Sequence, residues 1–215
     1  MDFGPRPKYA RDHFLRADCN AAALGWIERW PDWPAPALAI YGPARCGKTH
    51  LAHIWAARAG GPVIDATALT LDSVADLAGR PVAVERAECV AEPRALLHLY
   101  NLQREQGSHL LLVSRTAPAH WPHRLPDLTS RLQAAPAVAI EAPDDGLFGP
   151  LLVKLAADRQ LLIGPDVVHY LTQRLERTFA AAEAAVSALD RASLEGKRPV
   201  TVPLAGEIVR ELGGS

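Results

Sequence analysis

Gly42-Pro43-Ala44-Arg45-Cys46-Gly47-Lys48-Thr49, followed by His50, is the stretch that decides the fold. It fits the pattern Gly-x-x-x-x-Gly-Lys-Ser/Thr at every fixed position, and the composition gives only about one accidental match per thousand such chains. The glycines of this pattern let backbone N–H groups turn toward a phosphate, the lysine brings positive charge, and the threonine hydroxyl is a Mg²⁺ ligand. A helix expected from His50 to Ala59 points its positive end at the same anion. We therefore predict that residues 42–50 bind ADP or ATP together with Mg²⁺.

The sequence on either side of this loop predicts a parallel α/β domain followed by helices. Short apolar runs predict strands at 37–41, 62–65, 81–85, 109–114 and 137–141. Helical patterns separate several of these runs, and strands that alternate with helices form a parallel sheet with both faces covered. After residue 141 only helical patterns remain, at 146–160, 165–176, 178–195 and 203–212. The expected fold is a P-loop α/β module with a five-stranded parallel sheet and a small all-helical domain.

These patterns divide the chain into four parts: a lead-in at 1–37, a nucleotide-binding domain at 38–142, a helical domain at 143–212 and a tail at 213–215. The lead-in is rich in proline and tryptophan, and Asn20 is the expected N-cap of a short helix that ends near Trp30. Trp26, Trp30 and Trp33 have two interpretations. Packing beneath the lead-in is favoured over an adenine-side or partner-facing patch, because aromatic residues mostly serve burial.

The overall composition is typical of a globular chain without a membrane segment. Hydrophobic residues make up 49% and charged residues 22%, and no apolar run approaches the roughly 18 residues of a membrane span. The formal charge of -1 gives no positive field that would draw the protein onto nucleic acid. Cys19, Cys46 and Cys89 lie too far apart for a disulfide framework or a zinc site. We expect a cytoplasmic protein without strong direct DNA binding.

An acidic segment follows the strand predicted at 81–85. Hydrolytic P-loop proteins place an acid at the end of a later strand to hold Mg²⁺, and a further residue orients the attacking water. Glu85 suits the first role, although Glu85 and Arg86 also fit a merely solvated strand end. Arg86 stands where many such ATPases have their catalytic acid, and an arginine is no base at neutral pH. Glu88 would have to be re-aimed to replace it, so we expect the protein's own ATP hydrolysis to be weak or absent.

With these pieces together, the chain resembles the DnaA-related AAA+ family, and within it the Hda-type regulatory inactivators of the replication initiator. The resemblance covers about residues 12–212 and is carried by Gly42–Leu51, Glu85–Cys89, Leu125–Leu132 and Leu189–Ser193. It implies that Lys48 and Thr49 contact phosphate and Mg²⁺ and that Glu85 takes the Walker B role. It also implies that Arg131 is an arginine finger, presented in trans to the nucleotide of a neighbouring subunit.

The role of Arg131 is predicted only from the family resemblance of its surrounding segment. Nineteen of the 23 basic residues are arginines, so an isolated arginine is most simply a surface ion pair. The segment Leu125–Leu132 singles it out, and Arg124 is a weaker second candidate.

The sequence departs from the family pattern at three places. The sensor 2 arginine of the family aligns with Ala180, and Arg177 lies one turn earlier. At the predicted sensor 1 position many relatives have an acid, but here the strand ends at Ser114. Ser114 or Thr116 is therefore the candidate polar residue for the sensor 1 role. At the N-terminus, Met1-Asp2-Phe3 resembles only the last three positions of the short peptide with which Hda-type proteins bind the sliding clamp.

The resemblance implies a nucleotide-binding regulator of replication initiation that docks on DnaA and promotes ATP hydrolysis there. The implied partners are DnaA, the DNA polymerase sliding clamp through the N-terminus, and further copies of the chain. The alternative is a stand-alone AAA+ ATPase, such as a helicase-loader-like protein that acts on single-stranded DNA. A metal other than nucleotide-bound Mg²⁺ is not expected, because the pairs His50/His53 and His120/His123 lack a third ligand with matching spacing.

Overall fold

The computed structural model describes residues 9–123 and 125–213, and the chain divides into two compact units, Met1–Glu141 and Ala142–Ser215. We call them the α/β unit and the helical unit. Arg124 and the peptide Met1–Phe3, both considered above, lie outside the described residues.

The α/β unit is built on a five-stranded parallel sheet with the order β2-β3-β4-β1-β5, so the prediction of such a sheet is confirmed. The side chains of β1 and β4 are almost fully buried, because central strands of a parallel sheet are covered on both faces. The strands are β1 (Ala37–Tyr41), β2 (Val63–Asp65), β3 (Val82–Glu85), β4 (Leu110–Ser114) and β5 (Ala137–Ala139).

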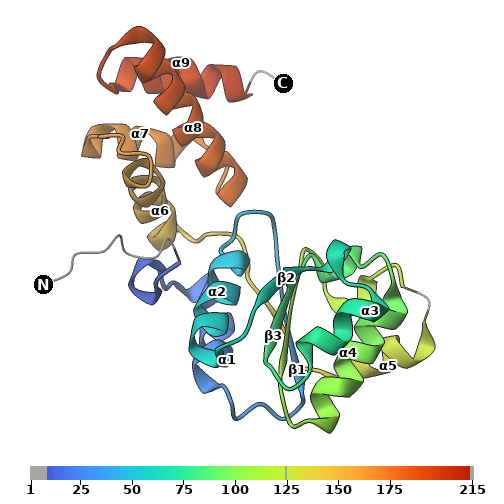
Figure 1. Cartoon of the computed structure of the whole chain (residues 1–215). Helices are drawn as coiled ribbons and strands as arrows, with labels where there is room; N and C mark the ends of the chain where they lie inside the picture. Colours follow the sequence, from blue (N-terminus) through green and yellow to red (C-terminus); the bar gives the residue numbers. More distant parts are fainter. Residues whose placement is uncertain (1–8, 124, 214–215) are drawn as a thin grey trace, which may run out of the picture. The chain divides into compact units, whose positions relative to one another are not determined.

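Helices cover both faces of this sheet (Figure 1). Helices α1 (Asp18–Arg29) and α2 (Lys48–Ala59) lie on one side, and α3 (Leu71–Val74), α4 (Pro93–Glu105) and α5 (Pro126–Ala134) lie on the other. The short α3 and the helix α5 were not predicted. Proline at the first position starts both α4 and α5, where its missing N–H costs no hydrogen bond. Short 3₁₀ turns complete the unit: η1 (Arg11–His13), η2 (Ala66–Ala68), η3 (Ala75–Leu77), η4 (Ala87–Cys89) and η5 (Pro118–His120).

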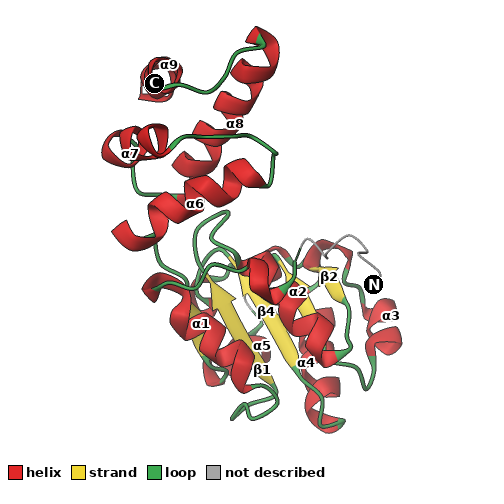
Figure 2. Ribbon diagram, turned by 90° about the vertical axis from the view of Figure 1, so that its left-hand side faces the viewer, coloured by secondary structure: helices red, strands yellow, loops and turns green. Residues whose placement is uncertain are grey.

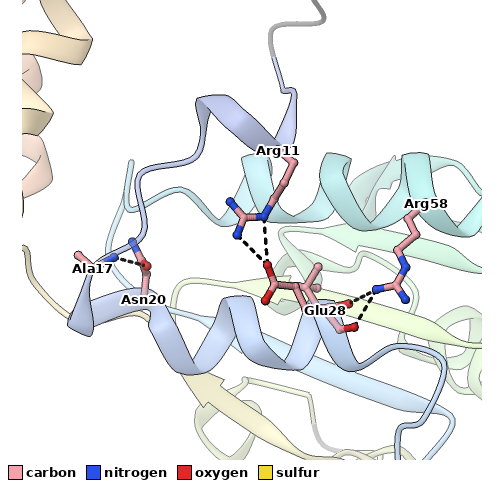
Figure 3. A network of polar contacts seen from close by, with 6 residues as sticks. Arg11, Ala17, Asn20, Glu28 and Arg58 are labelled. Atoms are coloured by element: carbon pink, nitrogen blue, oxygen red, sulfur yellow. Dashed lines mark hydrogen bonds and ion pairs between the residues drawn. The ribbon is translucent and has the colours of Figure 1, made fainter.

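The start of α1 corrects one prediction. Asn20 is not the N-cap, because the helix begins two residues earlier, after Ala17. The Asn20 side chain instead accepts a hydrogen bond from the Ala17 N–H at 3.0 Å (Figure 3). It also donates one to the Leu15 carbonyl at 2.8 Å. The Asn20 amide, at the third helical position, thus accepts from the N-cap backbone N–H as the N3 side chain of a capping box does. Sequence position alone does not distinguish this role from that of the N-cap residue.

The lead-in is held against the helices of the α/β unit. Arg11 of η1 donates to Glu28 of α1 at 2.7 Å, and Arg58 of α2 donates to the backbone carbonyls at the end of α1 (Figure 3). Trp33 is buried and stacks on Trp55 of α2, with ring centroids 5.5 Å apart, so the packing role predicted for it is confirmed.

The helical unit contains four helices in its described part and no strand (Figure 2). Side chains at the helix starts fix two of them: Asp144 accepts from the N–H of Leu147, and Thr178 accepts from that of Ala181. The unit has its own apolar core, which includes Phe148, Leu152, Leu171 and Val186. The helices are α6 (Asp145–Ala157), α7 (Pro165–Arg174), α8 (Phe179–Gly196) and α9 (Val202–Gly213). Within the described ranges, no helix is both long and apolar enough to cross a bilayer.

Candidate functional site

The P-loop follows β1 directly, at the carboxyl edge of the sheet. Tyr41, the last residue of β1, is in register with Ser114, the last residue of β4, and Glu85 ends the next strand along. Because parallel strands end at the same edge, the P-loop, Glu85 and Ser114 are gathered there. The chain leaves β1 toward β2 on one side, while β5 flanks β1 on the other, and such a switch point is where open α/β sheets bind ligands.

The two fixed glycines of the loop are needed by its geometry. A Cβ atom at Gly42 would overlap the Ile140 carbonyl oxygen. At Gly47 the backbone is left-handed, with φ +96°, and a Cβ atom would lie 3.0 Å from the Phe14 ring. Arg45 also has a left-handed φ, of +66°. Pro43, Ala44 and Arg45 are exposed, so the middle of the loop lies at the surface.

The Lys48 ammonium group lies against its own loop. Its Nζ atom donates to the carbonyls of Gly42 at 2.9 Å and Pro43 at 2.6 Å, and to the Cys46 sulfur at 3.5 Å. Burial raises the pKa of the Cys46 thiol, and the nearby lysine only opposes this effect. Cys46 is therefore a neutral, buried packing residue of the loop and not a reactive thiolate.

The first turn of α2 presents Thr49 and anchors the lead-in. Thr49 is exposed. His50 Nε2 lies 2.9 Å from the Ala10 carbonyl oxygen and donates to it, since a carbonyl only accepts, and His53 stacks on Tyr9 with centroids 4.2 Å apart. Both histidines of the i, i+3 pair are thus used in packing. No group of three His, Cys, Asp or Glu side chains suited to a metal ion occurs among the described residues.

Two carboxylates lie at the same edge, after β3. The Oε1 atom of Glu85 is buried and has no hydrogen-bond partner within the described residues. Glu88 accepts from the Arg115 N–H at 2.9 Å through Oε1, while its Oε2 is likewise buried and unpartnered there. A buried carboxylate oxygen without a donor is costly, so both oxygens are suited to an incoming cation or water. Carboxylate and hydroxyl oxygens are also the ligands Mg²⁺ prefers, and the set of Glu85 and Thr49 fits such an ion.

Arg86 is committed to a partner on β2. Its backbone is left-handed, with φ +53°, and its Nε donates to Asp65 at 2.7 Å. The β2–β3 register, which pairs Asp65 with Glu85, brings the two side chains together. The pKa of Asp65 is lowered, mainly by the Thr67 hydroxyl that donates to it and further by Arg86. Arg86 therefore supplies neither a base nor a free positive charge at this edge.

Ser114 is buried, and its hydroxyl donates to the Thr116 carbonyl at 2.8 Å. That carbonyl also accepts from the Trp121 indole at 2.9 Å. A phosphate oxygen can only accept, so Ser114 has to release Thr116 before its hydroxyl proton can reach a phosphate. In this conformation Ser114 stabilises the turn after β4.

Arg131 lies on α5, which leads into the edge strand β5. Its guanidinium carbon is 5.7 Å from the centroid of the Tyr100 ring on α4, and its Nε is buried without a hydrogen-bond partner. In the described part of the chain no carboxylate pairs with it, whereas Arg86 and Arg159 each have one.

The predicted sensor 2 region belongs to the helical unit. There Arg177 forms an ion pair with Asp145, and both side chains are exposed. Ala180, at the position the family alignment gives to the sensor arginine, is exposed on the first turn of α8.

Several residues that shape the site were not predicted. Phe14 packs on Gly47, Asp65 holds Arg86, Tyr100 lies under Arg131, and the Arg115 N–H binds Glu88. Each of these contacts joins segments that are far apart in the chain, and no local pattern marks them.

The helical unit and the fold are similar to known proteins. Residues 150–209 match the family model of the Hda lid domain. Domain III of the replication initiation protein DnaA from Thermotoga maritima is similar with a TM-score of 0.81 and 16% identity, over 95% of this chain and 97% of that one. AMPPCP-bound DnaA from Aquifex aeolicus gives 0.70 and 20%, over 91% and 68%. A RuvB mutant from Thermotoga maritima gives 0.66 and 16%, over 96% and 72%.

At these identities the similarity to solved structures shows the fold, which is that of an AAA+ module with a helical lid. The lid match adds a sequence relationship to it. The lid sequence is thus similar to that of Hda, and the fold of the chain is similar to that of DnaA and other AAA+ modules.

Proposed function

We propose that this protein is a nucleotide-binding regulator of replication initiation that docks on DnaA and promotes ATP hydrolysis there through Arg131. The observation that carries the proposal is the state of Arg131 within the segment Leu125–Leu132. Its guanidinium is partly buried and faces a ring, and no described carboxylate neutralises it. Because no described carboxylate neutralises it, the guanidinium group keeps its full charge for pairing with a phosphate of another molecule.

Nucleotide binding by the chain itself rests on the loop Gly42–Thr49. The middle of this loop is exposed at the carboxyl edge of the sheet, before the start of α2, and DnaA proteins of the same fold bind AMPPCP. We propose ADP or ATP as the ligand. Lys48 would exchange its loop carbonyls for phosphate oxygens, and Thr49 and Glu85 would hold the bound Mg²⁺. When present, Mg²⁺ neutralises charge between the phosphates.

Weak intrinsic hydrolysis follows from the acid segment. Arg86 occupies the position next to Glu85 and is paired with Asp65, so it does not activate water. Glu88 is already held at the end of β4 by the Arg115 N–H, and only one of its oxygens is available. The protein would therefore hold nucleotide as a structural ligand while Arg131 acts on the nucleotide of its partner.

The proposed action of Arg131 is electrostatic. A trans arginine stabilises the negative charge that develops on the γ-phosphoryl oxygens, which in GTPases raises the rate by roughly 10³–10⁵. The protein contributes this charge only when docked, so hydrolysis by DnaA would depend on the concentration of the complex.

The test compares Arg131→Ala with Arg104→Ala, a control at an exposed arginine of α4, the helix that also carries Tyr100. Hydrolysis of ATP bound to DnaA is measured against the concentration of each variant. We expect Arg131→Ala to abolish the stimulation with an unchanged melting temperature, and Arg104→Ala to retain it. Unchanged stimulation by a folded Arg131→Ala protein would show that the mechanism is wrong.

A second candidate function is a stand-alone AAA+ ATPase acting on single-stranded DNA. The unpartnered Oε2 of Glu88 favours it, because a free carboxylate oxygen at this edge can orient water. Single-turnover hydrolysis by the isolated protein separates the two functions, since the regulator is expected to show almost none. Clamp binding through Met1–Phe3 and self-association remain predictions.

A further inference from the structure

The contact between Arg131 and Tyr100 joins two helices of the α/β unit. Helix α5 lies beside α4 (Figure 1). Leu128 and Leu132 are buried in the same apolar core as Tyr100. Arg131 follows Leu128 by three residues and so shares its face of α5. From there its guanidinium reaches the Tyr100 ring, with 5.7 Å between the guanidinium carbon and the ring centroid.

Among the described residues, the Arg131 guanidinium group interacts with the Tyr100 ring. The Nε atom is buried without an acceptor, and no ion pair or hydrogen bond of the side chain competes with the ring in that part of the chain. The face of an aromatic ring attracts a guanidinium group through its quadrupole. A carboxylate in the same place would orient the group as well, but it would also cancel the charge.

We infer that Tyr100 is the positioning residue for Arg131: its ring fixes the direction of the guanidinium group while leaving the charge available to a phosphate of the partner. The inference rests on the proposed function, and it adds a residue that the segment Leu125–Leu132 does not contain. Tyr100 is buried on the face of α4 that is turned toward α5. Burial raises the pKa of its phenol, so the ring carries no negative charge near neutral pH that would pair with Arg131.

The first test uses Tyr100→Leu and Tyr100→Phe in the full chain, with ATP-loaded DnaA as the partner. Tyr100→Leu removes the ring, and we expect the maximal rate of stimulated hydrolysis to fall about tenfold, while the concentration giving half-maximal stimulation stays unchanged. Tyr100→Phe keeps the ring and is expected to retain most of the rate.

The second test keeps the volume of the side chain and so protects the fold. Phenylalanine carrying increasing numbers of fluorine atoms is placed at position 100, which weakens the negative potential of the ring face stepwise. The maximal stimulated rate should fall with each step, while the melting temperature and the half-maximal concentration stay constant. A flat response across the series, in proteins that fold and dock, would overturn the inference.

Different results would contradict the proposed function and the positioning role of Tyr100. If Arg131→Ala leaves stimulation intact, the proposed function is wrong and the role of Tyr100 falls with it. If Arg131→Ala abolishes stimulation but the fluorinated series does not change the maximal rate, only the positioning role is wrong. A parallel rise in the half-maximal concentration without a change in maximal rate would place Tyr100 in docking and would also contradict the inference.

Discussion

Arg86 and Asp65 are joined across the end of the β2–β3 pair, where the arginine Nε donates to the aspartate at 2.7 Å. The pair explains how an arginine is accommodated beside Glu85, at the position where a hydrolytic relative would carry an acid. Its guanidinium is drawn toward β2 and away from the strand end of β4. The same edge keeps two carboxylate oxygens, on Glu85 and Glu88, without partners among the described residues.

The pair gives a pH-dependent prediction for Asp65→Asn. The folded pKa of Asp65 lies below its ordinary value of 3.8, so the unfolded chain takes up the proton first as pH falls. The stabilisation is therefore fully present above that value and is lost as pH falls through the folded pKa. Urea unfolding at pH 7 should show Asp65→Asn slightly less stable than the natural chain, by a small amount because the pair is exposed, with the gap closing as pH falls below 3.8. A gap that stays constant over this range would contradict the assignment.

Lys48→Ala should remove nucleotide binding without unfolding the chain. Lysine is the only charged residue among the fixed positions of the loop motif. In this structure its ammonium group donates to the loop carbonyls of Gly42 and Pro43. We expect the dissociation constant for ADP, measured by calorimetry, to rise by about 100-fold or more. Lys154→Ala is the matched control, because this lysine of α6 pairs with Asp158, which follows the end of that helix. Equal affinities for ADP in the two variants would show that Lys48 does not contact the phosphates.

Gly47→Ala should cost more stability than Gly60→Ala. Both glycines have a left-handed φ at an end of α2, but a methyl group at Gly60 meets no atom within 4 Å, whereas at Gly47 it meets the Phe14 ring. Gly60→Ala should lower the free energy of unfolding by about 1 kcal/mol through the backbone alone. Gly47→Ala should lose at least about 1 kcal/mol more through overpacking, together with nucleotide affinity. Equal losses in urea unfolding would mean that Phe14 does not pack on the loop.

The cysteines should react with iodoacetamide at different rates. Cys89 is exposed, whereas Cys46 is buried and the pKa of its thiol is raised by that burial. In the folded protein at pH 7.5 we expect Cys89 to be alkylated about tenfold faster than Cys46 or more, and in denaturant the two rates should converge. Peptide mass spectrometry after a short pulse measures both. Rapid labelling of Cys46 in the folded chain would show an open loop.

The fold was largely predictable because its signals are local. The five strands appear as apolar runs, and α4 appears as a buried stripe of Leu96, Leu99 and Tyr100 at helical spacing. Helix α5 escaped prediction because it is only nine residues long, begins after a proline-rich loop and buries only Leu128 and Leu132. Asn20 was placed correctly near a helix start but in the wrong role, because a capping side chain and one that reaches back from the third position look alike in sequence.

The sequence by itself determined the P-loop and the strand-then-helix organisation, which depend on spacing within single segments that backbone geometry and hydrophobic periodicity translate directly into structure. Arg131 was singled out only by the resemblance of its segment to the DnaA-related family. Only the tertiary structure decided that Arg86 is paired with Asp65, that Lys48 rests on its own loop, and that Arg131 faces Tyr100 and no described acid. Each of these contacts joins side chains from different elements or depends on a rotamer, and the charge available at a site is set by such partners and not by the residue type.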